Sequence, residues 1–300
     1  MSKWFNPYVA LAIGVVSVSL SAIFVKFAEA PAGIIAFYRL LFSVLILLPV
    51  FLYKYVGELK GITKKDWFFS TVAGVFLAFH FILWFESLNY TSVASSTVLV
   101  TLQPLFAFVG TYVFFKEKIT IKAVFCGAIA IFGSFIISWG DFRISGMALY
   151  GDILALIACA LVTAYLLFGQ EVRKRLSLIT YTFIVYGIST ITLFIYVVAM
   201  NYPLTGYANS DWLWFFLLAV VSTLLGHSLF NWSIKWISTN VISMSILFEP
   251  VGASVLAFYL LNESITLTQF IGGSIVILSI AVYLRDNRKI KQRTKHLKVG

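Results

Sequence analysis

Ten long apolar segments, separated by short polar breaks, are the feature that most constrains the fold of this chain. They cover roughly residues 6–26, 33–53, 67–88, 93–115, 121–139, 148–169, 179–200, 211–234, 240–261 and 267–284. The hydrocarbon core of a bilayer is about 30 Å thick, and a helix needs roughly 20 apolar residues to cross it. The composition points the same way, because 61% of the residues are hydrophobic and only 11% are charged. The sequence therefore predicts an all-α membrane protein with ten transmembrane helices.

The basic residues predict how these helices are oriented. If the N-terminus is cytoplasmic, 19 of the 22 lysine and arginine residues lie on that side, and only Lys26, Arg39 and Arg143 lie on or near the outer side. Cytoplasmic loops of membrane proteins carry an excess of Lys and Arg. We therefore expect a multi-pass protein of the cytoplasmic (plasma) membrane with both termini in the cytoplasm. The basic tail, 286–300, then faces anionic lipid, so the net charge of +10 indicates no nucleic-acid partner.

The chain also contains an internal repeat. A shift of 146 residues aligns "TLQPLFAFVGTYVFFKEKIT" (101–120) with "LFEPVGASVLAFYLLNESIT" (247–266) without a gap. Over 84–136 and 230–282, eleven of the fifty-three aligned pairs are identical. Self-similarity at one fixed shift indicates copies of one structural unit. We predict a first five-helix repeat over 1–140 and a second over 146–285.

An odd number of helices per repeat means that the second copy enters the membrane inverted, as in many secondary transporters. The loop charges agree, because three lysines of the first copy become uncharged in the second: Lys116, Lys118 and Lys122 correspond to Asn262, Ser264 and Thr268. Glu117 and Glu263 are identical in both copies although they lie on opposite sides. We interpret them as structural, with negative charge near the start of the next helix and Thr120 or Thr266 as its N-cap. A substrate role is the alternative.

Lys26, Pro31 and Arg39 in the first two segments, followed by "SLNYTSVASSTVLVTLQPLF" and "KEKIT", resemble the EamA-type transporters of the drug/metabolite transporter superfamily. The resemblance covers nearly the whole chain, in both repeats. It implies a ten-helix exporter or importer of small metabolites, such as amino acids or related compounds, and of the two we expect an exporter. It also implies a central cavity between the two repeats.

Glu249 places a carboxylate near the midpoint of the ninth apolar segment. Its partner in the first repeat is Gln103, and the two residues precede Pro104 and Pro250. A proline inside a helix removes a hydrogen bond and clashes with the carbonyl four residues earlier, so both helices should bend at half depth. A charge there should face the bundle interior. Two interpretations remain open: Glu249 and Gln103 satisfy groups freed at the bends, or Glu249 lines the substrate path and carries a proton or binds a cationic group.

Other polar and aromatic residues within the segments are further candidates for the substrate path. They are His227, Asn231, His80, Trp84, Tyr38, Tyr165, Ser21 and Thr101. His227 and Asn231 are four residues apart, so they share one face of a helix, as do His80 and Trp84. Polar side chains also bond membrane helices to one another, and aromatic ones fill cores. Both roles remain open for each of these residues.

Lys26 and Arg39 lie towards the outer ends of the first two segments, where long side chains reach the headgroups. We expect them to act as anchors at the outer mouth, with Glu86 as their counter-ion. The alternative is that they attract anionic substrate groups or gate the outer mouth.

The sequence argues against an enzyme, because it contains no catalytic motif, and it predicts neither a metal site nor a cofactor. A channel and a non-transporting membrane scaffold or accessory subunit remain alternatives. There is no ATP-binding motif, so a gradient or exchange must drive transport, and protons are a candidate coupling ion. The expected partners are the small-molecule substrate and the lipid bilayer.

Overall fold

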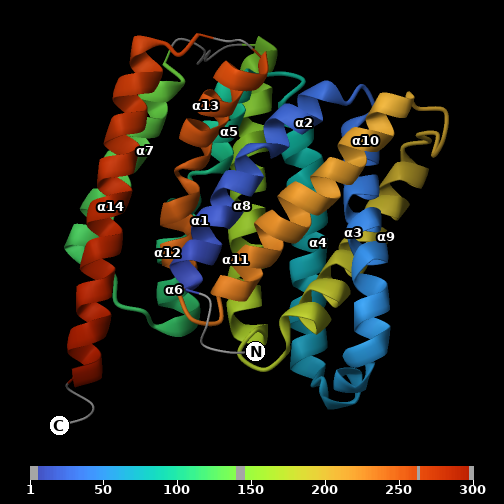
Figure 1. Ribbon diagram of the computed structural model, residues 1–300, viewed down its shortest axis with the longest axis horizontal. Helices are drawn as coiled ribbons and strands as arrows, with labels where there is room; N and C mark the ends of the chain where they lie inside the picture. The colour runs from blue at the N-terminus through green and yellow to red at the C-terminus, as the bar shows by residue number, and fades with distance from the viewer. Residues whose placement is uncertain (1–5, 140–145, 262–263, 297–300) are drawn as a thin grey trace.

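The computed structural model describes residues 6–139, 146–261 and 264–296, and the regular elements of these residues are helices (Figure 1). The first repeat contains α1 (Pro7–Ser19), α2 (Ser21–Phe27), α3 (Ala32–Lys54), the short 3₁₀ helix η1 (Val56–Gly61), α4 (Lys64–Ser87), α5 (Val93–Val100), α6 (Gln103–Phe115) and α7 (Ile121–Ile137). The second contains α8 (Gly146–Val172), α9 (Leu178–Ala199), α10 (Asn209–Leu217), the π-helix η2 (Leu218–His227), α11 (Ser228–Ser233), α12 (Thr239–Ile246), α13 (Glu249–Leu261) and α14 (Leu267–His296).

These helices confirm the predicted ten-helix membrane fold. Within the described ranges, nine helical segments are long and apolar enough to cross a bilayer, and α7 is a shorter apolar helix between them. Several spans consist of more than one helix, because α1 and α2, α5 and α6, and α12 and α13 each join into one segment. Apolar side chains remain exposed on the outer faces of α3, α7, α9 and α14, as lipid-facing helices require.

Polar N-caps begin several of the helices. The Thr63 hydroxyl accepts the Asp66 amide at 3.1 Å, and the Asp66 carboxylate in turn bonds back to Thr63 as a capping box. Thr120 accepts the amide of Ala123 at 3.1 Å at the start of α7. Thr266 accepts the amide of Gln269 at 3.2 Å at the start of α14. The N-cap role predicted for both threonines is therefore confirmed.

The main contacts between helices are symmetric: each has a counterpart in which both helices are replaced by their equivalents in the other repeat. Helix α4 of the first repeat packs along α8 of the second, and the corresponding contact joins η2 and α11 of the second repeat to α1 of the first. The contact of α3 with η2 likewise corresponds to that of α4 with α9. The pairs α3 with α9 and α7 with α14 join equivalent helices of the two repeats, and the contact of α6 with α12 corresponds to that of α5 with α13. This symmetry confirms the inverted-repeat architecture.

The crossing of α7 and α14 shows the same symmetry in its contacts (Figure 1). A Cβ atom added at Gly272 would lie 2.5 Å from the carbonyl oxygen of Gly133, so only glycine fits there. At the equivalent point the Ser279 hydroxyl donates to the carbonyl of Cys126 at 2.6 Å. Close backbone approach through small residues is how membrane helices pack tightly.

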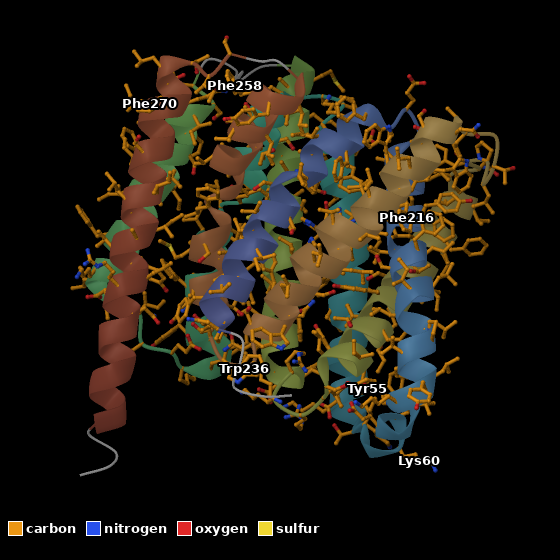
Figure 2. All side chains as sticks on the ribbon, in the orientation of Figure 1. Tyr55, Lys60, Phe216, Trp236, Phe258 and Phe270 are labelled. Carbon is orange, nitrogen blue, oxygen red and sulfur yellow. The ribbon has the colours of Figure 1, made fainter. Side chains whose placement is uncertain are left out.

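The two ends of the bundle differ in their charged residues. We call the end that carries η1, residues 173–177, the segment 116–120 and Lys235 the basic end. Figure 2 labels Lys60 and Trp236 near this end and Phe258 near the other. The opposite end carries the connections from α2 to α3 and from α4 to α5. Because α5 and α13 lie towards the opposite end and α6 and α12 towards the basic end, the joints between them fall inside the bundle (Figure 1).

Candidate functional site

Spans four and nine are interrupted at mid-depth, directly before the two prolines predicted to bend them. The helix ends that meet there are Val100 and Ile246, where α5 and α12 end, and Gln103 and Glu249, where α6 and α13 begin. Pro104 and Pro250 occupy the second position of their helices, where a missing N–H is tolerated. The predicted bends are therefore complete breaks. Two helix N-termini, with free N–H groups and partial positive charge, therefore begin inside the bundle.

A cavity of about 20 Å³ lies at these breaks. It is lined by the six polar or aromatic candidates Ser21, His80, Trp84, Gln103, His227 and Glu249, and by the apolar residues Val18, Val100, Val162, Leu166, Phe230 and Ile246. A cavity needs roughly 10–15 Å³ to hold one water molecule. The cavity therefore has room for about one water molecule, and a metabolite can bind in it only if the helices around it move apart.

The cavity lies on the symmetry axis that relates the two repeats. Residues 146 positions apart are equivalent, and three equivalent pairs line it: Trp84 with Phe230, Val100 with Ile246 and Gln103 with Glu249. Trp84 carries an N–H group that Phe230 lacks, and Glu249 carries a carboxyl group where Gln103 carries an amide. The site is therefore symmetric in position but not in chemistry. The acidic member, Glu249, belongs to the second repeat and is 6% exposed.

Several polar atoms around the cavity are buried without a hydrogen-bond partner in the described part of the chain. Among the lining residues these are Trp84 Nε1, Gln103 Oε1 and His227 Nδ1. Protein interiors normally satisfy such groups, and an unsatisfied one costs about 1–3 kcal/mol. His80 differs, because its Nδ1 lies 2.9 Å from the carbonyl oxygen of Ala158. The cavity therefore presents one indole donor and several acceptor or ambivalent groups to whatever occupies it.

The prediction that Arg39 lies at the outer mouth is wrong. Its side chain is 0% exposed and points into the bundle from α3. Its Nε donates to the Thr223 hydroxyl at 2.7 Å, its Nη1 donates to the Ser21 hydroxyl at 2.9 Å, and its guanidinium carbon lies 4.1 Å from the centre of the Phe81 ring. Ser21 lines the cavity, so Arg39 lies directly behind the cavity wall. The position of Arg39 along its apolar segment indicated its approximate depth in the membrane, but it did not indicate which way the side chain points.

Lys26 and Glu86 do lie near the opposite end, but neither pairs with Arg39. Lys26 Nζ donates to the carbonyl of Leu88 at 2.7 Å, and Glu86 accepts a bond from Asn89 at 3.4 Å. Both contacts lie where α4 ends and the chain turns into α5. The prediction that Glu86 is the counter-ion of Arg39 is therefore also wrong, because the Arg39 guanidinium bonds to Thr223 and Ser21 instead.

A ten-residue π-helix, η2, positions the polar residues of span eight. Within it the Thr223 hydroxyl donates to the carbonyl of Leu218 at 3.1 Å, five residues earlier. Long π-helical stretches are rare and are frequently found at functional sites. His227 and Asn231, predicted to share one face, are separated as a result: His227 lines the cavity and Asn231 contacts α8, while Thr223, four residues before His227, holds Arg39. No signal in the sequence indicates this π-helix.

The other four candidates for the substrate path make bonds within the protein and do not line the cavity. Asn231 Nδ2 donates to the Tyr165 hydroxyl, which joins α11 to α8. The Thr101 hydroxyl donates to the carbonyls of Thr97 and Val98, both at 2.9 Å, and so satisfies the end of α5. Tyr38 donates to the carbonyl of Leu204 towards the opposite end. For these residues the structure favours the packing alternative.

Glu117 joins the two repeats at the basic end. Its carboxylate accepts hydrogen bonds from the side-chain amides of Gln170, at 3.1 Å, and Asn240, at 3.2 Å. Asn240 also accepts from the Thr111 hydroxyl at 2.9 Å, and Gln170 accepts from the amide and the hydroxyl of Thr239, both at 2.7 Å. We call these five residues the Glu117 cluster. The predicted structural role of Glu117 thus extends to a contact between repeats, whereas Glu263 lies outside the described residues.

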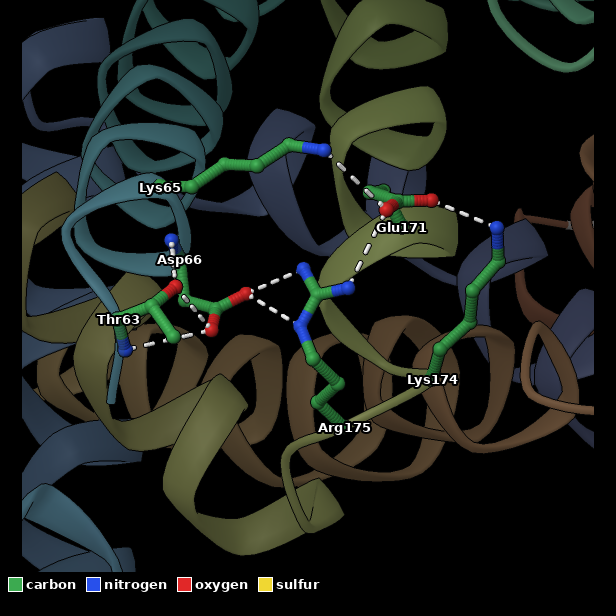
Figure 3. Close-up of polar contacts among 6 residues, drawn as sticks. All are labelled: Thr63, Lys65, Asp66, Glu171, Lys174 and Arg175. Atoms are coloured by element: carbon green, nitrogen blue, oxygen red, sulfur yellow. Dashed lines mark hydrogen bonds and ion pairs between the residues drawn. The ribbon is translucent and has the colours of Figure 1, made fainter. Parts of the chain in front are cut away.

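A second charged cluster at the basic end connects α4 to α8 (Figure 3). Arg175 donates from Nε and Nη2 to one oxygen of Asp66, at 2.9 and 2.5 Å. Glu171 lies beside them, within 2.6 Å of Lys174, 3.2 Å of Arg175 and 3.5 Å of Lys65. The hydrogen bonds to Asp66 raise the pKa of Arg175 above its usual value. Every charged side chain drawn in this cluster therefore has an opposite charge beside it.

A bundle of inverted repeats, with broken helices around a polar midplane cavity, defines a membrane transporter. Residues 6–139 and 149–285 match the EamA-like transporter family, so the chain belongs to that family. It is 24% identical to an uncharacterized transporter of Archaeoglobus fulgidus over 92% of this chain and 96% of that protein. It is 25% identical to the uncharacterized transporter YxxF of Bacillus subtilis over 74% and 71%. A protein of known crystal structure shares the fold, with a TM-score of 0.75, 16% identity and coverage of 94% and 99%.

Proposed function

We propose that this protein is a secondary transporter that exports small metabolites, such as amino acids or related compounds, by alternating access. The observation that supports this most is the midplane cavity, which combines broken helices, buried polar atoms without partners and a position on the symmetry axis. A substrate would supply the hydrogen bonds that the protein leaves unmade. Import is the alternative direction.

The proposed mechanism is a rocking of the repeat 1–140 against the repeat 146–285 around this cavity. Contacts between the repeats close both ends. The Glu117 cluster lies at the basic end, and at the opposite end the amide of Glu29 donates to Asp211 at 2.9 Å. We interpret the 20 Å³ cavity as an occluded state, from which either contact opens in turn.

Orientation and energy source complete the proposal. The positive-inside rule places the basic end and both termini in the cytoplasm, in the cytoplasmic membrane. Glu249 is the candidate proton carrier, because it is the buried carboxylate that lines the cavity. We expect no enzymatic activity, cofactor or nucleic-acid partner, and the partners are the substrate and the lipid bilayer.

Flux into proteoliposomes that contain only this protein tests the proposal. A metabolite screen of cells with and without the protein would first select the compounds. A transporter gives flux that saturates with concentration, which Glu249→Gln reduces. A scaffold or accessory subunit gives no flux, and a channel gives flux that does not saturate at low concentration; either result would contradict the proposal.

A further inference from the structure

Arg39 is the charge whose surroundings the proposed function leaves unexplained. It is fully buried inside the membrane-spanning helix α3. Charged side chains inside a membrane are rare, and they usually pair with one another or mark a substrate path. In the described part of the chain the ion pairs involve the cations Lys65, Lys122, Lys174 and Arg175, and none involves Arg39. Its positive charge is therefore not neutralised by a carboxylate in contact with it.

The neighbours of Arg39 hold the guanidinium in place without using all of its donors. A guanidinium carries five N–H donors. Thr223 accepts from Nε and Ser21 accepts from Nη1, while Nη2 is buried with no partner among the described residues. The ring of Phe81 lies 4.1 Å from the guanidinium carbon and fixes its plane. A third acceptor, for Nη2, is therefore missing beside a cation that is already oriented.

Arg173, the other fully buried arginine of the described chain, shows how the fold holds an arginine for structure alone. It is 2% exposed, and it donates to the backbone carbonyls of Asn231, at 2.9 Å, and Leu176. Burial lowers the pKa of Arg173 to about 10, which still leaves the side chain charged at neutral pH. Its bonds close a helix end, and it lies at the basic end rather than beside the cavity.

Glu249 supplies the opposite charge on the same cavity. It lines the cavity as the first residue of α13, and among the described residues no ion pair joins it to Arg39. The cavity thus lies between a fixed cation behind Ser21 and a carboxylate at a helix N-terminus. An occupant with both signs of charge would pair with both groups, whereas a singly charged one would leave one of them unpaired.

We propose that the transported substrate is a small zwitterion whose carboxylate binds to Arg39 and whose ammonium group binds to Glu249. This inference rests on the proposed function and specifies the chemistry of the same site. Arg39 is then a specificity-determining residue, and Ser21 and Thr223 are positioning residues that hold its guanidinium. The guanidinium fork matches a carboxylate in geometry, which a lysine ammonium in the same place does not.

Matched probes that differ only in charge test this on the purified full-length protein. The probes are the proteinogenic amino acids, the amines that lack their carboxylate and the acids that lack their amine, each added while the melting temperature is measured. A ligand that binds the folded state raises this temperature. We expect at least one amino acid to stabilise the protein and to bind about 10- to 100-fold more tightly than its amine or acid counterpart.

Variants then assign the carboxylate to Arg39. In Arg39→Gln the amino acid should lose this 10- to 100-fold advantage over its amine, because the amide cannot neutralise the carboxylate. Thr223→Val keeps the arginine and removes only the acceptor of Nε, so it should lose a smaller part of the advantage, and it remains informative if Arg39→Gln does not fold. Arg173→Gln is the matched control, which should lower the melting temperature but leave the preference for the amino acid unchanged.

Two outcomes would overturn the inference. One is a wild-type protein that binds the amine or the acid as tightly as the amino acid; the other is an unchanged preference in both Arg39→Gln and Thr223→Val. The proposed function fails separately. Saturable flux of amines or uncharged metabolites, without binding of amino acids, would leave a transporter but reject the zwitterion, whereas charge-selective binding without flux would keep the site and reject transport.

Discussion

Buried polar groups at the midplane and at the basic end of this bundle are treated in opposite ways. At the basic end, Glu117 accepts from two amides and Asp66 accepts from two nitrogens of Arg175. Around the midplane cavity, Arg39 Nη2 and Gln103 Oε1 have no partner among the described residues. Polar groups that serve the fold find partners within the protein. Unpartnered atoms such as the Asp152 carboxylate oxygens also occur elsewhere in the described chain, but those of Trp84, Gln103 and His227 gather on the wall of one cavity, where a ligand can bond to them.

The largest expected effect is that of Glu249→Gln on transport. The amide keeps the size of the side chain but neither carries a proton nor pairs with a cation, so flux should fall by about 100-fold, equivalent to about 3 kcal/mol. The melting temperature should stay equal or rise, because a buried charge is removed. The loss of transport is measured as flux into proteoliposomes at several pH values. Gln103→Ala at the equivalent position is the control and should reduce flux less; unchanged flux and unchanged pH dependence in Glu249→Gln would rule out the proton role.

Arg173→Leu should show the opposite result, a loss of stability without a loss of selectivity. It leaves the carbonyl oxygens of Asn231 and Leu176 without their donor, and each unsatisfied buried acceptor costs about 1–3 kcal/mol. We expect a loss of about 2 kcal/mol in unfolding free energy, measured by denaturant titration in detergent. Flux per folded molecule should be retained. A variant that keeps its stability and loses flux would show that the two buried arginines do not differ as described.

Asp66→Asn should destabilise the bundle by about 1 kcal/mol, because the carboxylate is buried while the Arg175 side chain is 41% exposed and partly screened by solvent. The asparagine oxygen can still accept from Thr63, so the capping box is kept and only the ion pair is lost. Lys122→Gln removes the more exposed ion pair with Asp286 and is the control. Unfolding measurements should show no change in that control. An equal loss of unfolding free energy in both variants would mean that the burial of Asp66 does not strengthen its ion pair with Arg175.

The smallest effect is expected for Glu117→Gln. The amide retains one acceptor oxygen, so one of the two hydrogen bonds, to Gln170 or Asn240, is lost. A single hydrogen bond is worth about 0.5–1.5 kcal/mol, so the basic end should open about threefold more readily. Thiol labelling of the cavity from the basic side should accelerate by that factor, with binding affinity in the cavity unchanged. A loss of binding instead would move Glu117 from the contact between the repeats into the substrate site.

Much of the fold could be predicted from the sequence, because lipid imposes a strong and simple constraint on composition. The apolar segments gave the helices, and the 146-residue shift paired Gln103 with Glu249, which the structure brings together at the cavity. Pro104 and Pro250 indicated where the helices are interrupted, because proline has no N–H group to donate to the carbonyl four residues earlier.

The direction of side chains and the local helix type could not be predicted in the same way. Arg39 was placed near an outer end because depth can be counted along a helix, whereas its orientation depends on contacts with Ser21 and Thr223 from other spans. Thr223 faces Arg39 from a π-helix that no residue pattern indicates. Tyr165 and Asn231 have the residue types expected of a binding site but bond to each other.

Access to the cavity from the two sides tests the central claim most directly. Val162→Cys places a thiol on the cavity wall after Cys126 and Cys159 are replaced by alanine, and Val185→Cys is a buried control that does not line the cavity. We expect membrane-impermeant thiol reagents to label residue 162 slowly from either side, and a transported metabolite to block this labelling. The control position should not react. Two results would contradict a substrate cavity between the two repeats. One is that residue 162 reacts from neither side of the membrane, and the other is that no transported metabolite slows its labelling.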